Sequence, residues 1–308
     1  HTIARTIVSE LGIQHTVVDS RVRENLCVED YRDTNKRQAC LASLVMYEDK
    51  TLIYVNSRDE SIVLTRMLRK RLPFMATRIA FYHAGLSRDD RKVVESLFRA
   101  GEMRAIVSTS AFGEGINLPD IQNVVLYHLP FNEVAFNQLS GRAGRDGRQA
   151  KISLLYGRAD VSINKRILLA SAPQRDDLAT LYRALRNISP TNLRKTNSAE
   201  LLRECLRINP HCGFEQKGII AALAIFTELG LIEEKGISSD TDVRSLVLTK
   251  VRERVELTSS CRYLEGCKEL LSFEEFKEWA LSAPISELQT RVSAPILPDM
   301  RLLTGQEN

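Results

Sequence analysis

Short apolar segments alternate with amphipathic helical segments over residues 51–156, and this alternation most constrains the fold. The apolar segments are rich in β-branched and aromatic side chains, as buried strands are, and they cover 51–55, 78–82, 104–108, 122–129 and 151–156. The segments between them have helical spacing, as in Leu64, Leu68 and Leu72. Strands that alternate with helices predict an α/β fold in which helices cover both faces of a parallel sheet.

Residues 138–147, QLSGRAGRDG, contain two arginines three positions apart, each preceded by a glycine. On a helix end this spacing places Arg142 and Arg145 on one face. Guanidinium groups carry a permanent charge and bind phosphate oxygens in a forked geometry, while glycines allow close approach. The pattern indicates a phosphate site, and a glycine-containing helix terminus with solvated arginines is the alternative.

Three further polar segments follow predicted strands, which is where parallel sheets bind ligands. NSRDE, 56–60, offers Ser57 and Arg58 as donors to a phosphate backbone, although Ser57 could instead cap a helix. YHAGL, 82–86, could meet a phosphate or only form a turn. STSAFGEGINLPD, 108–120, combines hydroxyl groups with glycines that expose backbone amides.

These four segments, in this order, resemble the conserved motifs of superfamily-two helicases, and GRAGRDG resembles the RecQ branch. The resemblance covers about residues 25–170 and implies a RecA-like second motor domain. It implies that two catalytic arginine fingers reach an ATP held mainly by another domain, and these would be Arg142 and Arg145. It places three residues near the nucleotide, namely Gly115, Asn117 and Gln138. It places six residues on the backbone of a nucleic-acid strand, namely Ser57, Arg58, His83, Gly85, Thr109 and Ser110.

The sequence contains neither a GxxxxGK[ST] loop for ATP phosphates nor a DExH box. The resemblance places both in a first motor domain, which would precede His1. We therefore expect that ATP and Mg²⁺ are bound mainly by that domain, and that this chain alone does not hydrolyse ATP. The expected function is the C-terminal half of a 3′–5′ ATP-dependent DNA helicase that acts in repair and recombination. The alternatives are an RNA helicase and a non-catalytic scaffold that docks a recombination or nuclease partner.

The predicted domains are 1–22, a remnant of the first motor domain with its connector; 23–170, the RecA-like domain; 171–257, a linker helix and a winged helix; and 258–308, a helical tail with a loose end. Two helices followed by strand-like segments at 231–235 and 244–249 outline the winged helix. Its long helix is predicted to bury one face, consisting of Ile219, Ile220, Leu223, Phe226 and Leu229. Its wing carries the basic residues, namely Lys235, Arg244 and Lys250. Winged helices also dock proteins, and this alternative stays open.

Composition adds few constraints. A net charge of +4 permits an anionic partner without requiring one. The six cysteines form no CxxC pair, so the sequence predicts no zinc site and a cytoplasmic protein. No apolar run has membrane-spanning length. The expected partner is DNA, single-stranded or forked. Residues 258–284, in which Ser272 is predicted to begin a second helix, weakly resemble the tails of proteins that join a RecJ-type nuclease to a RecQ-like helicase, so such a nuclease domain or another repair protein is a further expected partner.

Overall fold

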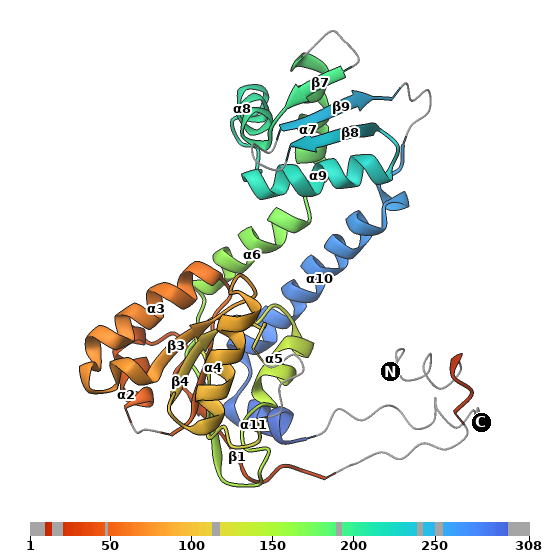
Figure 1. Cartoon of the computed structure of the whole chain (residues 1–308). Helices are drawn as coiled ribbons and strands as arrows, with labels where there is room; N and C mark the ends of the chain where they lie inside the picture. The colour runs from red at the N-terminus through yellow and green to blue at the C-terminus, as the bar shows by residue number, and fades with distance from the viewer. Residues whose placement is uncertain are drawn as a thin grey trace, which may run out of the picture. The chain divides into compact units, whose positions relative to one another are not determined.

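The computed structural model describes residues 10–13, 21–46, 49–112, 118–188, 193–238, 243–249 and 255–294. The chain divides into two compact units (Figure 1). The first unit contains residues 1–158 and 279–308, and the second contains residues 159–278. Most of the predicted remnant of the first motor domain, 1–22, lies outside the described residues, as do the last fourteen positions, 295–308.

Six described strands of the first unit form one sheet in the order β1-β6-β5-β2-β4-β3, and every neighbouring pair is parallel. The strands are β1 (Leu26–Asp30), β2 (Thr51–Tyr54), β3 (Ile79–Tyr82), β4 (Ala105–Ser108), β5 (Asn123–Leu126) and β6 (Ala150–Leu154). The predicted parallel α/β sheet is confirmed. Its central strands β2, β4 and β5 are buried along their whole length, because helices cover both faces.

Helices connect these strands and cover the sheet (Figure 1). They are α2 (Arg37–Val45), α3 (Arg58–Arg71), the 3-10 helix η1 (Pro73–Arg78), α4 (Arg88–Ala100) and α5 (Glu133–Ser140). Helices α2 and α3 share one hydrophobic cluster with one face of the sheet. Side-chain caps fix where three helices begin: Ser57, Ser87 and Asn132 accept from the backbone N–H three residues further on. The helix starts are thus encoded locally.

The end of the chain packs against the edge of this sheet. Helix α11 (Ile285–Ser293) lies along β1, where the side-chain amide of Gln289 takes the place of a neighbouring strand. Its Nε2 donates to the Leu26 carbonyl at 2.8 Å, and its Oε1 accepts from the Val28 N–H at 2.7 Å. An exposed strand edge is thereby covered by a helix.

The predicted boundaries differ from the observed ones in the tail. Helix α10 (Cys261–Ser282) is continuous, so Ser272 lies inside it and the predicted helix start there is wrong. Residues 258–278 belong to the second unit, where Lys165 pairs with Glu274 at 2.7 Å, and residues after 278 belong to the first. The predicted separate tail over 258–308 is therefore divided between the two units.

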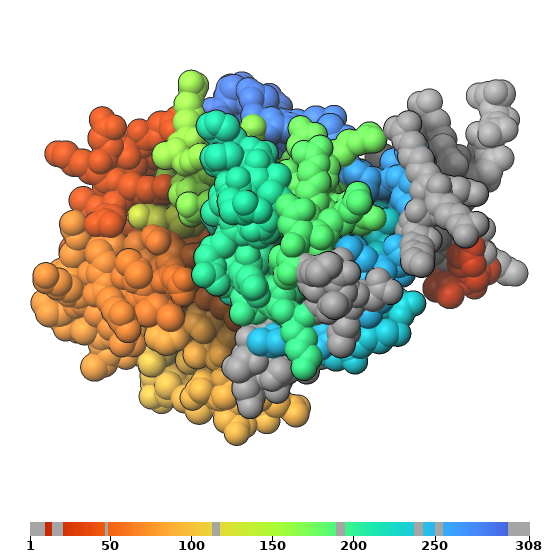
Figure 2. Space-filling model, turned by 90° about the horizontal axis from the view of Figure 1, so that it is seen from above, coloured from red at the N-terminus to blue at the C-terminus, as the bar shows by residue number. Residues whose placement is uncertain are grey.

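The second unit has the order helix, strand, helix, helix, strand, strand that defines a winged helix. These elements are α7 (Arg175–Ile188), β7 (Leu193–Thr196), α8 (Ser198–Ile208), α9 (Gln216–Glu228), β8 (Ile232–Ser238) and β9 (Val243–Leu248). The strands form an antiparallel sheet in the order β7-β9-β8. On the surface of this unit α8 lies beside α7 (Figure 2).

Three details of the second unit were not predicted. Strand β7 occupies part of a segment that reads as a polar joint, because its pairing with β9 is not visible locally. Helix α6 (Asp160–Ser171) packs against α9 and belongs to the second unit. The first part of the first unit therefore ends at residue 158, whereas the sequence predicted a domain end at 170. Ile220, expected in the core, is 39% exposed, whereas Ile219, Leu223 and Phe226 are buried. Among the described residues no helix is both long and apolar enough to cross a membrane.

Candidate functional site

The ends of three neighbouring strands bring most of the predicted strand-binding residues to one edge of the sheet. Tyr54 of β2 and Tyr82 of β3 both lie level with Ser108 of β4. Arg58 follows β2, and Thr109 follows β4 directly. The carboxyl ends of parallel strands are a common ligand site. The structure therefore places these polar residues together at one carboxyl edge.

Gly85 leaves room for the side chains of Arg58 and His83, which both lie beside it. A Cβ atom at Gly85 would lie 3.1 Å from Arg58 Nη1 and 3.1 Å from His83 Nδ1, so only glycine allows this approach without displacing a side chain. The Gly85 N–H donates to His83 Nδ1 at 3.1 Å, and the Leu86 N–H donates to the His83 carbonyl at 3.0 Å. The turn that the sequence left as an alternative is therefore present.

The hydroxyl-bearing residues at this edge have mixed roles. Ser57 Oγ accepts from the Glu60 N–H at 3.1 Å, so Ser57 caps α3, as its alternative interpretation proposed. The hydroxyl hydrogen of Ser57 is still able to donate. Thr109 is half-buried and its N–H donates to the Tyr82 carbonyl at 3.3 Å, whereas Ser110 is exposed. The backbone of Thr109 thus ties β4 to β3 and leaves the next residue at the surface.

Asn56 and His128 were not predicted to cooperate. The Asn56 N–H donates to His128 Nδ1 at 3.1 Å, and Asn56 Nδ2 donates to the Leu129 carbonyl at 2.8 Å. These bonds join the segments that follow β2 and β5, two neighbouring strands. Asn56 therefore shapes the edge on which Ser57 and Arg58 stand.

The segment that carries Arg142 and Arg145, residues 141–148, is called the arginine turn below. It follows α5, and its Gly144 N–H donates to the Ile121 carbonyl at 2.7 Å while its Asp146 N–H donates to the Pro119 carbonyl at 3.0 Å. Residues 119–121 precede β5, so the turn lies toward the amino ends of the strands. It differs in this from the three segments that follow β2, β3 and β4, because α5 returns the chain along the sheet.

The two predicted arginine fingers lie close to each other. Arg145 Nε donates to the carbonyl of Gly141, the residue that follows α5, at 3.0 Å. Partial burial and the positive charge of Arg142 lower the pKa of Arg145, while the Tyr54 hydroxyl opposes this shift. Within the described ranges no carboxylate forms an ion pair with Arg145. This guanidinium group therefore contributes a positive charge that no carboxylate among the described residues neutralises.

A third arginine, which sequence reasoning missed, adjoins this pair. Arg23 Nη1 donates to the Gly141 carbonyl at 3.3 Å, and its Nη2 donates to the Ala143 carbonyl. Burial, and then the charge of Arg145, lower the pKa of Arg23. Arg23 and Gly141 are 118 residues apart, so no local pattern could have marked this contact.

Asn25 holds the rest of the arginine turn. Its Nδ2 donates to the carbonyls of Gly144 and Arg148, both at 2.8 Å. Gly144 has φ +56°, and a Cβ there would lie 2.6 Å from Asn25 Nδ2 and 2.8 Å from the Ala150 Cβ. Glycine is needed at 144 for both its backbone conformation and its lack of a side chain.

The remaining predicted nucleotide-binding residues are only partly described. Gln138 is exposed in the last turn of α5. Gly115 and Asn117 lie outside the described residues. In the part of the chain that the structure describes, no group of three His, Cys, Asp or Glu side chains is arranged to hold a metal ion.

The predicted basic wing has a different electrostatic character. Lys235 pairs with Glu233, and Arg244 Nη1 pairs with Glu234 Oε1 at 2.9 Å. Lys250 lies outside the described residues. Each of the two described wing cations thus has a carboxylate partner. The wing offers less positive charge than its sequence suggested.

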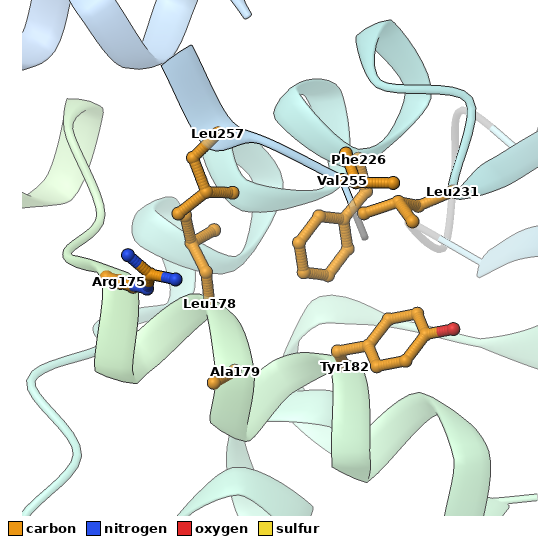
Figure 3. Close-up of a pocket in the computed structure, with 8 residues that line it drawn as sticks. All are labelled: Arg175, Leu178, Ala179, Tyr182, Phe226, Leu231, Val255 and Leu257. Carbon is orange, nitrogen blue, oxygen red and sulfur yellow. The ribbon is translucent and has the colours of Figure 1, made fainter. Parts of the chain in front are cut away.

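The second unit also contains an apolar pocket of about 300 Å³ (Figure 3). Side chains of α7, α9 and the segments after them line it, namely Arg175, Leu178, Ala179, Tyr182, Phe226, Leu231, Val255 and Leu257. Tyr182 and Phe226 meet edge to face with their ring centroids 6.0 Å apart. Arg175 is the one cation of the lining, and six of the other seven side chains are purely hydrocarbon. The pocket therefore suits apolar groups and not phosphates.

Comparison with known proteins agrees with this geometry. Residues 35–147 match the family described as "Helicase conserved C-terminal domain". RecS of Bacillus subtilis, a probable ATP-dependent DNA helicase, is 30% identical over 184 residues, which are 58% of this chain and 36% of RecS. The ATP-dependent DNA helicase RecQ of Pasteurella multocida is 31% identical over 192 residues, which are 60% of this chain and 29% of RecQ.

The aligned part spans about a third of the length of these two relatives. Among solved structures, the Mycobacterium smegmatis helicase Lhr bound to single-stranded DNA and AMP-PNP is 16% identical, with a TM-score of 0.40 over 77% of this chain and 33% of that one. A similarity at this level supports no argument about function. Residues 35–147 therefore match the helicase C-terminal domain family, the parallel sheet has the RecA-like fold of that domain, and the chain is similar to RecQ-type DNA helicases.

Proposed function

We propose that this chain is the C-terminal half of a RecQ-type, ATP-dependent DNA helicase with 3′–5′ polarity. Arg145 and Arg142 serve as arginine fingers for an ATP held mainly by a first motor domain. The sheet edge with Ser57, Arg58, Gly85, Thr109 and Ser110 holds the backbone of one DNA strand, and His83 shapes that edge.

The observation that carries the proposal is the charge of the arginine turn. Arg145 is fixed at its Nε by a carbonyl, and no carboxylate in the described ranges pairs with it. Its outer nitrogens are thus available to an anion. Charge that develops on a transferring phosphoryl group is stabilised by guanidinium groups held in advance in this way.

The rest of the ATP-binding site would lie in the first motor domain. ATP phosphates fit the positive arginine turn, and in the described part of the chain no group of three His, Cys, Asp or Glu side chains is arranged to hold Mg²⁺. We infer from the resemblance to superfamily-two helicases that the metal ligands belong to the first motor domain. This chain alone is then inactive in ATP hydrolysis.

The test compares two arginines of the same turn in the full-length protein. Arg148 is paired with Asp146 at 2.6 Å, so it is a matched control for Arg145. Arg145→Ala is expected to lower the kcat of DNA-stimulated ATP hydrolysis by roughly 10³-fold, and Arg148→Ala should leave it within about twofold. Equal effects of the two substitutions, or ATP hydrolysis by residues 1–308 alone that Arg145→Ala abolishes, would contradict the proposal.

DNA and RNA are distinguished by a binding experiment. Fluorescence anisotropy of the same protein with forked DNA, single-stranded DNA and a matching RNA, over a salt series, should show binding that weakens steeply with salt. Preference for forked DNA supports the proposal, and preference for RNA supports the RNA-helicase alternative. Arg58→Ala is expected to weaken binding and to reduce the salt dependence by about one phosphate contact.

A second candidate function concerns the winged helix alone. Both described wing cations are paired with glutamates, and the unit has an apolar pocket, so a docked repair or nuclease protein fits its surface better than a phosphate backbone does. Tyr182→Ala and Leu257→Asp in the pocket should leave DNA affinity unchanged and remove the partner in a pull-down of repair proteins. A loss of DNA affinity with the partner retained would contradict this candidate.

A further inference from the structure

The connector residues that precede β1 contact the arginine turn at several backbone carbonyls. Arg23 and Asn25 together donate to four of them, those of Gly141, Ala143, Gly144 and Arg148. The Ala150 N–H in turn donates to the Asn25 carbonyl at 2.9 Å. A turn that is far away in the sequence is thus held by two side chains of one short segment.

One of these carbonyls is shared with a proposed arginine finger. The Gly141 oxygen accepts from Arg23 Nη1 at 3.3 Å and from Arg145 Nε at 3.0 Å. A guanidinium group is planar, so fixing its Nε–H on one acceptor restricts where its outer nitrogens point. Any movement of the Gly141 carbonyl would therefore redirect the Arg145 guanidinium.

The charges support the same conclusion. Arg23 is partly buried beside Arg145, and two like charges in proximity are unfavourable. An arrangement that only stabilised the turn would be served as well by a neutral donor such as that of Asn25. A cation behind the finger adds repulsion, which favours conformations in which the outer nitrogens of Arg145 point away from Arg23.

We propose that Arg23 is a positioning residue for Arg145. Arg23 holds the Gly141 and Ala143 carbonyls and repels the guanidinium group of Arg145, while Asn25 fixes the remainder of the turn. This inference rests on the proposed function, since it assumes that Arg145 acts on ATP. The connector thereby sets the geometry of the arginine finger.

The first test needs no activity. Amide hydrogen exchange is measured in this chain over the arginine turn, whose Gly144 and Asp146 amides are bonded to carbonyls before β5. Arg23→Ala should raise exchange there about tenfold. The exposed residue between the two connector donors provides the matched control, and Glu24→Ala should change nothing. Unchanged exchange in Arg23→Ala would overturn the proposal, whatever the function of the chain.

The second test measures ATP hydrolysis by the full-length protein. Arg23→Ala should lower kcat roughly 10- to 100-fold with little change in the KM for ATP, because displacing a catalytic group costs rate more than binding. Arg23→Lys should give an intermediate kcat, because an ammonium group cannot reproduce the forked contact. A merely destabilising substitution would lower the amount of active enzyme in both variants equally.

A double substitution separates this proposal from the proposed function. If Arg23 acts through Arg145, then adding Arg23→Ala to Arg145→Ala should cause no further loss of kcat. Full additivity would overturn the positioning role and leave the arginine finger intact. An Arg145→Ala variant with normal kcat would instead refute the proposed function, and increased exchange in Arg23→Ala would then still show that Arg23 holds the turn.

Discussion

The arginine turn and the wing contain the same kinds of cation in opposite electrostatic settings. In the arginine turn Arg145 is held by a backbone carbonyl, and the charge that shifts its pKa most is that of another arginine, Arg142. In the wing Lys235 and Arg244 each face a glutamate two to ten residues away. A basic residue is available to an anion only where no carboxylate has already paired with it.

The arginine turn and the wing also differ in how closely other atoms surround their glycines. The largest expected effect, a loss of unfolding free energy, follows from this difference. A Cβ at Gly144 would meet Asn25 and Ala150, whereas one at Gly236 of the wing would meet nothing within 4 Å. Gly144→Ala is expected to lower the free energy of unfolding by about 3 kcal/mol, and Gly236→Ala by less than about 0.5 kcal/mol. Urea unfolding measures both. Similar losses would show that the arginine turn is no more tightly held than the wing.

A carboxylate placed beside the arginine turn should make it resemble the wing. Gln138 is exposed in the last turn of α5 and lies four residues before Arg142, which follows the end of that helix. Gln138→Glu is expected to lower the kcat of ATP hydrolysis about tenfold below that of Gln138→Ala, since the new carboxylate competes with phosphate for the arginines. The alanine variant controls for any loss of the glutamine itself. Equal kcat values for the two variants would show that a carboxylate beside the arginine turn does not reduce the availability of its arginines to phosphate.

The reverse change should make the wing resemble the arginine turn. Glu233→Gln removes the carboxylate that pairs with Lys235, whose side chain is 57% exposed. We expect a few-fold gain in affinity for duplex DNA and a steeper salt dependence, because one more cation can meet a phosphate. Anisotropy titrations of this chain measure both quantities, with Glu269→Gln on the exposed side of α10 as the charge control. A gain of the same size in the control would assign the effect to net charge.

The smallest expected effect concerns a carboxylate that has neutral partners. Glu228 accepts from the Ser260 hydroxyl and the Cys261 N–H, both at 2.8 Å, and the Ser260 bond is the main reason that its pKa is lowered. A lowered pKa means that Glu228 stabilises the fold above its ordinary value of about 4.5 and loses this contribution as the pH falls through the lowered value. The Tm of Glu228→Gln should therefore vary less between pH 6 and about pH 3 than that of the wild type. An unchanged dependence of Tm on pH would show that the hydrogen bonds of Glu228 add no stability.

Much of the fold follows from local sequence patterns. The buried strands, the helix starts at Ser57 and Ser87, and the order of the polar segments are all visible over a few residues. Strand β7 and helix α6 were missed because their identity depends on partners far along the chain. The polar segment 193–196 is a strand because it pairs with β9, and its own sequence shows no strand periodicity.

The sequence by itself determined which residue types stand at the functional positions: two arginines after glycines, a cap serine before Arg58, and a glycine that leaves room for the side chains of Arg58 and His83. Only the tertiary structure decided which cations remain available. It paired Arg244 with Glu234, left Arg145 on a carbonyl, and brought Arg23 across 118 residues to the Gly141 carbonyl. Side-chain spacing along a helix or strand is a local property, whereas charge compensation depends on distances through space, and these exist only once the chain has folded.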